Sequence, residues 1–244
     1  MFKEFGMVFF IVIIHEIGHF TAALHFKWNV DKIVIYPFGG CCKFNERVNT
    51  SSREELIILL CGPIAQITLY IIIGYLSTKG FMTYRNLLIF KAYHYTLLSF
   101  NLLPIYPLDG GRMLNIILNY LLPFKKGNKI TIFISIIFVL ITMTFYKNLN
   151  FTMMSILLIS ELLIYLKKQP FLYNKMLLER YMNNYSFKKL KLINNKDDMY
   201  KNYRHIILYR DKYITEKSYL NKRFKVKKWK RYFFYLYAYL LFFT

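Results

Sequence analysis

The chain has 244 residues, of which 56% are hydrophobic and 19% aromatic, and it carries a formal net charge of +21. So apolar a composition is unusual for a soluble protein and is typical of a polytopic membrane protein. Three cysteines do not make a disulfide framework, and most of the positive charge lies between residues 167 and 231.

The first apolar run, residues 6–24, contains the sequence HEIGH from His15 to His19. Histidines four residues apart lie on one face of an α-helix, where both rings can bind one zinc ion. Glu16 lies about 100° further round the helix and can act as a general base toward an attacking water. A chance match is the alternative, but ionisable groups in a membrane helix are costly and usually functional. The run therefore predicts a metal site at membrane depth.

Residues 32–44 follow this run and combine β-branched residues, a glycine pair and a second short apolar stretch. This pattern predicts a β-hairpin, and its apolar character favours a hairpin that dips into the membrane interface. A substrate strand could pair with its edge, which makes Gly39 and Gly40 candidate substrate-binding residues. A plain connecting hairpin is the alternative.

Four further apolar runs are candidate transmembrane helices; they comprise residues 56–77, 87–103, 130–146 and 149–166. A shorter run, residues 113–122, cannot span a bilayer. With the N-terminus outside, five spans place most loop lysines and arginines inside. The predicted fold is an all-α polytopic membrane protein with about five transmembrane helices, a membrane-dipping β-hairpin and a small basic cytoplasmic tail.

A catalytic zinc site uses three protein ligands and keeps one position open for water. The candidates for the third ligand in the other apolar regions are His94, Asp109 and Glu161. Asp109 fits best, because two prolines and a glycine pair break the helix around it at a depth that matches the two histidines. His94 is interpreted as a packing histidine.

His-Glu-x-x-His in one membrane helix, followed by Asn-x-x-Pro-x-x-Pro-Leu-Asp-Gly at residues 101–110, resembles the paired signature of the site-2 proteases. These are zinc metalloproteases that cut proteins within or next to membranes. The resemblance implies that His15, His19 and Asp109 bind one Zn2+ per chain and that Glu16 is the catalytic acid–base. It also implies that Asn101 hydrogen-bonds substrate, with a cap for the broken helix as the alternative.

Three further stretches resemble the stage IV sporulation protein FB branch of this family: YPFGG at residues 36–40, CGPIAQ at residues 61–66 and LLERY at residues 177–181. The resemblance implies a membrane-associated pro-sigma factor as substrate and membrane-bound inhibitory or regulatory partner proteins. It places the multi-pass protein in the mother-cell membrane around the forespore. The orientation that places the basic loops inside puts the active site towards the cytoplasm. The branch has one more span before the His-Glu-x-x-His helix, so either an upstream helix precedes Met1 or this is a shortened member.

These features predict a transmembrane zinc metalloprotease domain at residues 1–166 and a basic cytoplasmic C-terminal region at residues 167–244. The resemblance implies that a truncated CBS-like remnant lies in this C-terminal region. The basic region favours contact with the lipid bilayer, and no direct nucleic-acid binding is expected. His205 is interpreted as an ordinary residue there, and the aromatic residues 232–243 as an interfacial anchor. The alternative function is a catalytically inactive zinc-binding membrane regulator or a metal-handling protein. Glu16 speaks against it, because a structural zinc site needs no base.

Overall fold

The structure, a computed structural model of the chain, describes residues 2–28, 30–36, 39–44, 48–145, 149–183, 185, 187, 189–209 and 212–225. It is mostly helical, and the helices are α1 (Phe2–His25), α2 (Ser52–Thr78), α3 (Tyr84–Asn101), α4 (Asp109–Leu121), α5 (Phe124–Phe145), α6 (Leu149–Met182) and α7 (Glu216–Lys225). The strands are β1 (Val30–Tyr36), β2 (Gly39–Phe44), β3 (Leu190–Ile193), β4 (Arg204–Tyr209) and β5 (Lys212–Thr215). The anchor predicted at residues 232–243 lies outside the described residues.

Three of the described helices are long and apolar enough to cross a membrane: Lys3–His25, Ser52–Thr78 and Phe124–Thr144. They correspond to three of the five predicted spans, at residues 6–24, 56–77 and 130–146. Ile71, Phe133 and Leu140 on these helices are 63%, 65% and 55% exposed, which suits side chains that face lipid rather than water. The protein is therefore an integral membrane protein with three candidate spans.

The other two predicted spans fall on α3 and α6, which are helical but less apolar, so five spans remain a prediction. α6 continues without a break across the predicted domain boundary at residues 166 and 167 and ends at Met182. The short run at residues 113–122 forms most of α4, which begins earlier, at Asp109.

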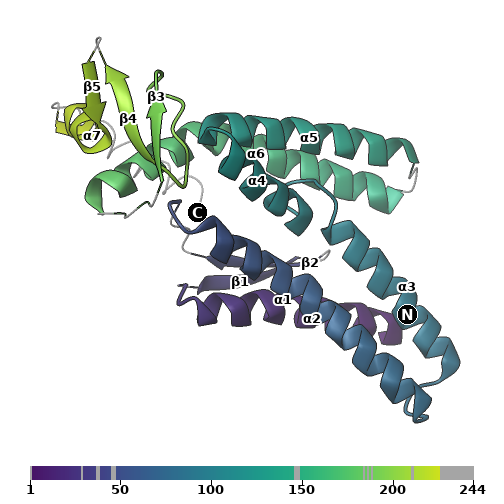
Figure 1. The fold of residues 1–244 in the computed structure, drawn as a ribbon. Coiled ribbons are helices and arrows are strands. Elements are labelled where there is room, and N and C mark those ends of the chain that lie inside the picture. The colour runs from purple at the N-terminus through teal and green to yellow at the C-terminus, as the bar shows by residue number, and fades with distance from the viewer. Residues whose placement is uncertain are drawn as a thin grey trace.

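The helices α1 to α6 form two groups (Figure 1). In the first, Ile11 of α1, Leu69 of α2 and Phe90 of α3 share a buried apolar cluster. In the second, Val139 of α5 and Leu162 of α6 pack together. The groups meet where α2 contacts α4, so the start of α4 is brought to the face that α1 and α2 share.

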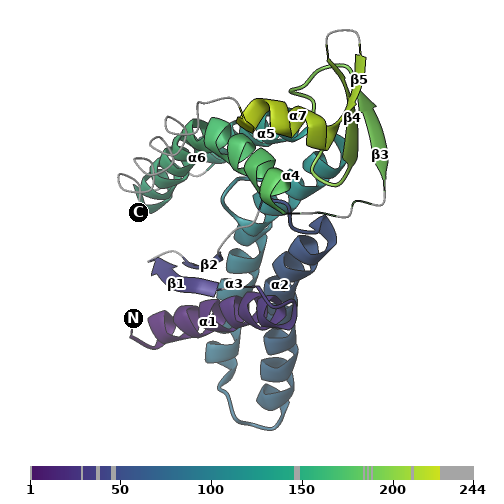
Figure 2. The ribbon, with the colours of Figure 1, turned by 90° about the vertical axis from the view of Figure 1, so that its left-hand side faces the viewer.

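The predicted hairpin is present as an antiparallel pair of β1 and β2. Gly39 pairs with Tyr36 and Gly40 pairs with Ile35, at the end of β1 and the start of β2. Both strands contact α1, and the hairpin lies along that helix in Figure 2. It therefore places a strand edge beside the helix that carries the histidines.

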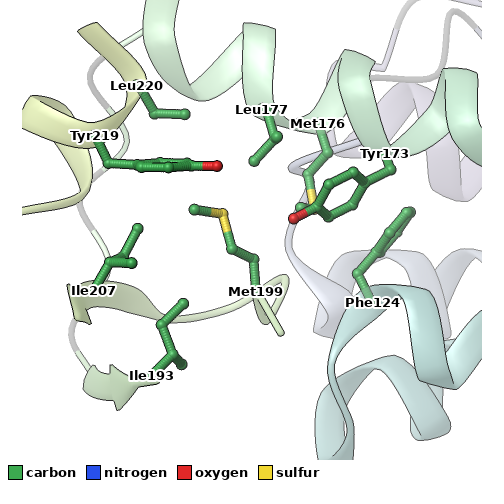
Figure 3. Packing of buried hydrophobic residues seen from close by; sticks show 9 residues of the cluster. All are labelled: Phe124, Tyr173, Met176, Leu177, Ile193, Met199, Ile207, Tyr219 and Leu220. Atoms are coloured by element: carbon green, nitrogen blue, oxygen red, sulfur yellow. The ribbon is translucent and has the colours of Figure 1, made fainter. Parts of the chain in front are cut away.

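The C-terminal module, defined as residues 190–225, is a sheet with β3 parallel to β4 and β4 antiparallel to β5, followed by α7. Figure 3 shows its core, in which the end of α6 contributes Met176 and Leu177, and the module contributes Ile207, Met199 and Leu220. All five side chains are fully or almost fully buried. The basic C-terminal region thus contains a packed module with a buried apolar core.

The end of α6 is joined to the segment that precedes α2. The Glu179 carboxylate accepts hydrogen bonds from the backbone nitrogens of Val48 (3.0 Å) and Asn49 (3.1 Å) and from the Asn49 side chain (3.0 Å). The neighbouring Arg180 donates from Nε to Asn49 Oδ1 (2.7 Å). Lys201 of the module also pairs with Glu55 in the first turn of α2. The end of α6 is therefore fastened to Val48 and Asn49, and the module is fastened to the first turn of α2.

His205 is not the ordinary residue that the sequence suggested, because it is 1% exposed within an ion-pair group. The backbone nitrogen of Tyr200 donates to its Nε2 at 3.0 Å, so Nδ1 carries the proton of the neutral ring. Nδ1 donates to Glu216 at 3.0 Å, and Glu216 also pairs with Arg180 at 2.9 Å. The sequence did not predict the buried group of His205, Glu216 and Arg180, because the strands of this region are short and lie among many basic residues.

Candidate active site

His15 and His19 lie one turn apart on α1 and are 3% and 5% exposed. Their Nε2 atoms are 3.1 Å apart. The Nδ1 atom of each ring has its own partner. His15 Nδ1 lies 3.0 Å from Oε1 of Gln66, and His19 Nδ1 lies 2.9 Å from the carbonyl oxygen of Ile58. A carbonyl oxygen only accepts, so His19 Nδ1 carries the proton and Nε2 keeps its lone pair.

Asp109 completes a triangle of ligand atoms. It is the first residue of α4, and its Oδ2 lies 2.9 Å from His15 Nε2 and 3.2 Å from His19 Nε2. Three electron-rich atoms this close repel one another unless a cation or a proton lies between them. The structure therefore brings together the three residues that the sequence predicted as zinc ligands.

Two glycines and a serine hold Asp109 in place. A Cβ at Gly110 would lie 2.2 Å from the carbonyl oxygen of Leu102, and one at Gly111 would lie 2.3 Å from backbone atoms of the same loop. The buried hydroxyl of Ser135 on α5 accepts the backbone N–H of Tyr106 at 3.0 Å. The glycine pair after Asp109 is thus needed for the close approach of α4 to the loop before it.

The arrangement fits a zinc ion. A tetrahedral site with bonds of about 2.0–2.1 Å separates its ligand atoms by roughly 3.3–3.4 Å. The observed separations of 2.9–3.2 Å need to widen only slightly. On the neighbouring helix, a Cβ at Gly62 would lie 2.3 Å from His19 Nε2 and 2.9 Å from His15 Nε2. Gly62 therefore leaves open the space next to the ligand atoms.

Glu16 lies beside this triangle. Its carboxylate belongs to one group with the nitrogens of His15 and His19, in which the ligand atoms all lie within 4.8 Å of one another. The side chain is half-buried, whereas both histidines are buried. Glu16 is thus close enough to act on a molecule at the triangle without being part of it.

The other predicted site residues, Asn101, Gly39 and Gly40, do not belong to the triangle of ligand atoms. Asn101 is the last residue of α3, half-buried at the start of the loop that leads to Asp109. Among the described residues, hydrogen bonds join the two histidines to Asp109, Gln66 and Ile58, and not to Asn101. Gly39 and Gly40 lie in β2, whose strand contacts α1.

Sequence analysis missed the parts of α2 that surround the histidines, which are Gln66, Gly62 and the carbonyl of Ile58. A glutamine inside an apolar run was a usable signal, because polar groups in a membrane helix need partners. His94 lies in a packing position, 2% exposed and stacked on Tyr70 with ring centroids 4.7 Å apart.

Comparison with known proteins agrees with this geometry. A profile of peptidase family M50 matches residues 4–93, which include both histidines, Glu16 and Gln66. Stage IV sporulation protein FB of Bacillus subtilis is 34% identical over 131 residues, which cover 54% of this chain and 46% of that protein. A zinc metalloprotease of Methanocaldococcus jannaschii is 30% identical over 129 residues, which cover 52% of this chain and 37% of that protein.

Among solved structures, a site-2 protease from Methanocaldococcus jannaschii matches with a TM-score of 0.48 and 28% identity, over 67% of this chain and 74% of that one. This chain spans less than half the length of the two curated relatives. The profile match and the two curated relatives nevertheless agree with the His-Glu-x-x-His group on α1. Residues 4–93 of the chain are thus similar to peptidase family M50, and about half of the chain is similar to the two curated relatives.

Proposed function

We propose that this protein is an intramembrane zinc metalloprotease that hydrolyses a peptide bond in a membrane-associated protein. The observation that carries the proposal is the convergence of His15 Nε2, His19 Nε2 and Asp109 Oδ2 within 3.2 Å of one another, beside Glu16. His15, His19 and Asp109 would hold one Zn2+ per chain, a donor set that zinc commonly accepts.

The chemistry divides between the zinc and Glu16. When bound, zinc supplies Lewis acidity, which polarises a carbonyl and lowers the pKa of water. Glu16 takes a proton from the attacking water and delivers it to the leaving amine. A zinc-binding regulator would need no such base, so the position of Glu16 favours the enzyme.

Hydrolysis requires an extended substrate, because a helix hides its carbonyls in hydrogen bonds. The edge of the hairpin beside α1 suits this task, and Gly39 and Gly40 would permit close approach of a substrate backbone. Asn101 would hydrogen-bond the substrate near the scissile bond. These three roles rest on the sequence signature and on the placement of β2 and the end of α3.

The substrate that the similarity supports is the pro-sequence of a sporulation sigma factor. The 34% identity to stage IV sporulation protein FB supports this substrate, together with the stretches YPFGG, CGPIAQ and LLERY. On this reading the protein lies in the mother-cell membrane around the forespore, with its site towards the cytoplasm. Membrane-bound inhibitory or regulatory proteins would be its partners. The predicted five spans and the excess of basic residues in the inside loops support that orientation.

The proposal is tested by co-expressing the chain with a candidate pro-sigma factor and following its processing. The wild type should shorten the substrate, and Glu16→Gln should not. Glu161→Gln is a matched control, because Glu161 is an exposed carboxylate on α6, away from the histidines. It should process the substrate as the wild type does. Processing by Glu16→Gln at the wild-type rate would contradict the proposal.

A further inference from the structure

Gln66 is a buried amide at the contact between α1, α2 and α3, and the zinc ligands and Glu16 do not account for its presence. Its side chain is 0% exposed. Burying an amide in an apolar setting costs free energy unless it is hydrogen-bonded. Gln66 meets this requirement twice, because Oε1 lies 3.0 Å from His15 Nδ1 and Nε2 donates to the carbonyl oxygen of His94 at 3.1 Å.

The carbonyl oxygen of His94 decides which way the Gln66 amide is turned. Because that oxygen only accepts, the amide nitrogen must face His94, and the amide oxygen must face His15. The amide oxygen also only accepts, so His15 Nδ1 carries the proton and donates it. His15 Nε2 then keeps its lone pair, which points toward Asp109 Oδ2 at 2.9 Å.

The two histidines reach the same tautomer by different means. His19 donates to the backbone carbonyl of Ile58, a group that no substitution removes. His15 depends on one side chain, Gln66. A substitution at Gln66 should therefore disturb His15 and leave His19 in place.

We propose that Gln66 is the positioning residue that fixes the tautomer and ring orientation of His15 as a metal ligand; this inference rests on the proposed zinc function. Histidines that bind metals almost always donate their second ring N–H, and loss of that partner typically costs about 10–100-fold in metal affinity or activity. Gln66 also ties His15 to α3, the helix that ends at Asn101.

The test measures the zinc dissociation constant of the full chain in lipid nanodiscs by competition with a chromogenic chelator. Gln66→Leu removes the acceptor and should weaken zinc binding about 10–100-fold. Gln66→Glu keeps an acceptor that faces His15, although it loses the donor to His94, and should bind zinc within a few-fold of the wild type. The visible spectrum of the Co2+-substituted chain should change in Gln66→Leu.

Gln169→Leu is the matched control. Gln169 forms the same kind of bond pair as Gln66, because it accepts from Asn128 at 2.8 Å and donates to the carbonyl oxygen of Tyr165 at 3.1 Å. Among the described residues, its bonds do not involve the histidines. Gln169→Leu should therefore leave the zinc dissociation constant and the cobalt spectrum unchanged.

Wild-type zinc affinity in Gln66→Leu would overturn the inference. Equal losses in Gln66→Leu and Gln169→Leu would also overturn it, because they would reflect a general loss of packing. If Gln66→Leu does not fold, the zinc affinity of Gln66→Glu decides the question. A loss of zinc affinity in Gln66→Glu, which keeps an acceptor for His15 Nδ1, would contradict the proposed role of Gln66. A wild-type chain that binds no zinc would instead overturn the proposed function and this inference with it.

Discussion

The backbone of Gly62 on α2 lies against the ring of His19 on α1 so closely that a Cβ would be 2.3 Å from Nε2. The same Cβ would be 2.9 Å from His15 Nε2. The backbone of α2 therefore lies directly against the two ligand nitrogens. Only glycine leaves the lone pairs of both histidines free.

Gly62→Ala should weaken zinc binding by at least about tenfold, by analogy with other changes that disturb ligand orientation. The added methyl group would displace one or both histidine rings. The measurement is the zinc dissociation constant of the purified chain by chelator competition.

Gly74→Ala on the same helix is the control, because a Cβ there would meet nothing within 4 Å. It should keep the wild-type zinc affinity, and it should gain up to about 1 kcal/mol in helix stability from alanine propensity. Equal zinc affinity in Gly62→Ala and Gly74→Ala would mean that α2 does not border the metal.

A buried polar group between α4 and α5 should stabilise the start of α4, where Asp109 lies. The Thr131 hydroxyl is 0% exposed, accepts from Asn115 at 3.0 Å and donates to the carbonyl of Gly127 at 2.9 Å. Thr131→Val keeps the shape but removes both bonds, so it should lower the free energy of unfolding by about 1–3 kcal/mol.

Thr144→Val is the control on the same helix, because the Thr144 hydroxyl is exposed and bonds only within the helix as far as the described contacts go. Reversible unfolding in mixed detergent micelles measures both variants. A Thr131→Val chain no less stable than Thr144→Val would show that this group does not fasten α4.

The docking of the end of α6 on the segment before α2 should depend on Glu179. Glu179→Ala leaves the three N–H donors of Val48 and Asn49 without this acceptor, which we expect to cost about 2–3 kcal/mol, as for hydrogen bonds to a charged group. Limited proteolysis of the full chain should then cut next to Val48 faster than in the wild type. Glu161→Ala, which changes an exposed carboxylate on the same helix, should be cut at the wild-type rate. Equal rates in both variants would contradict this docking role.

The C-terminal module should lose stability in mild acid. Burial lowers the pKa of His205 below 6.5. Below pH 6.5 the unfolded chain therefore binds a proton that the folded module does not, and stability falls as the pH drops. Burial raises the pKa of Glu216, but the hydrogen bond from His205 and the charge of Arg180 outweigh it and lower the pKa to about 2. The Glu216 contribution is present above pH 4.5 and is lost between pH 4.5 and about 2.

Hydrogen exchange of the β4 amides in the full chain, followed from pH 8 to pH 5 and corrected for intrinsic rates, measures this effect. Protection should be constant above about pH 7 and should decrease below pH 6.5. His205→Gln has no ionisable group at this position and should flatten the pH dependence in that range. A wild-type profile that is equally flat would show that His205 does not stay neutral in the folded module.

The sequence predicted the ligand triangle because its members carry strong local signals. His15 and His19 have helical spacing within an apolar run, and Asp109 is a carboxylate between prolines and glycines. Gln66 and Gly62 were assigned no role, because their function depends on which side of α2 faces α1. The side of α2 that faces α1 is set by the close approach of Gly18 on α1 to the backbone of Cys61 on α2. This contact between two helices cannot be read from the sequence of either one.

The number of spans and the nature of the tail were harder to predict for different reasons. Lys91 and His94 lower the hydropathy of α3, and Glu161 lowers that of α6, so composition alone does not separate a span from a buried helix. In the tail, the abundant lysines obscured the short strands whose alternate residues, such as His205 and Ile207, face the core.

The most direct test of the metal centre is the zinc content and zinc X-ray absorption spectrum of the purified full chain. We expect one zinc per chain, with imidazole nitrogens at about 2.0–2.1 Å and carboxylate oxygen at about 2.0–2.2 Å. The imidazole scattering should be lost in a chain in which both His15 and His19 are replaced by alanine. A sulfur ligand at about 2.3 Å, or the same spectrum in the doubly substituted chain, would contradict a zinc site built from His15, His19 and Asp109.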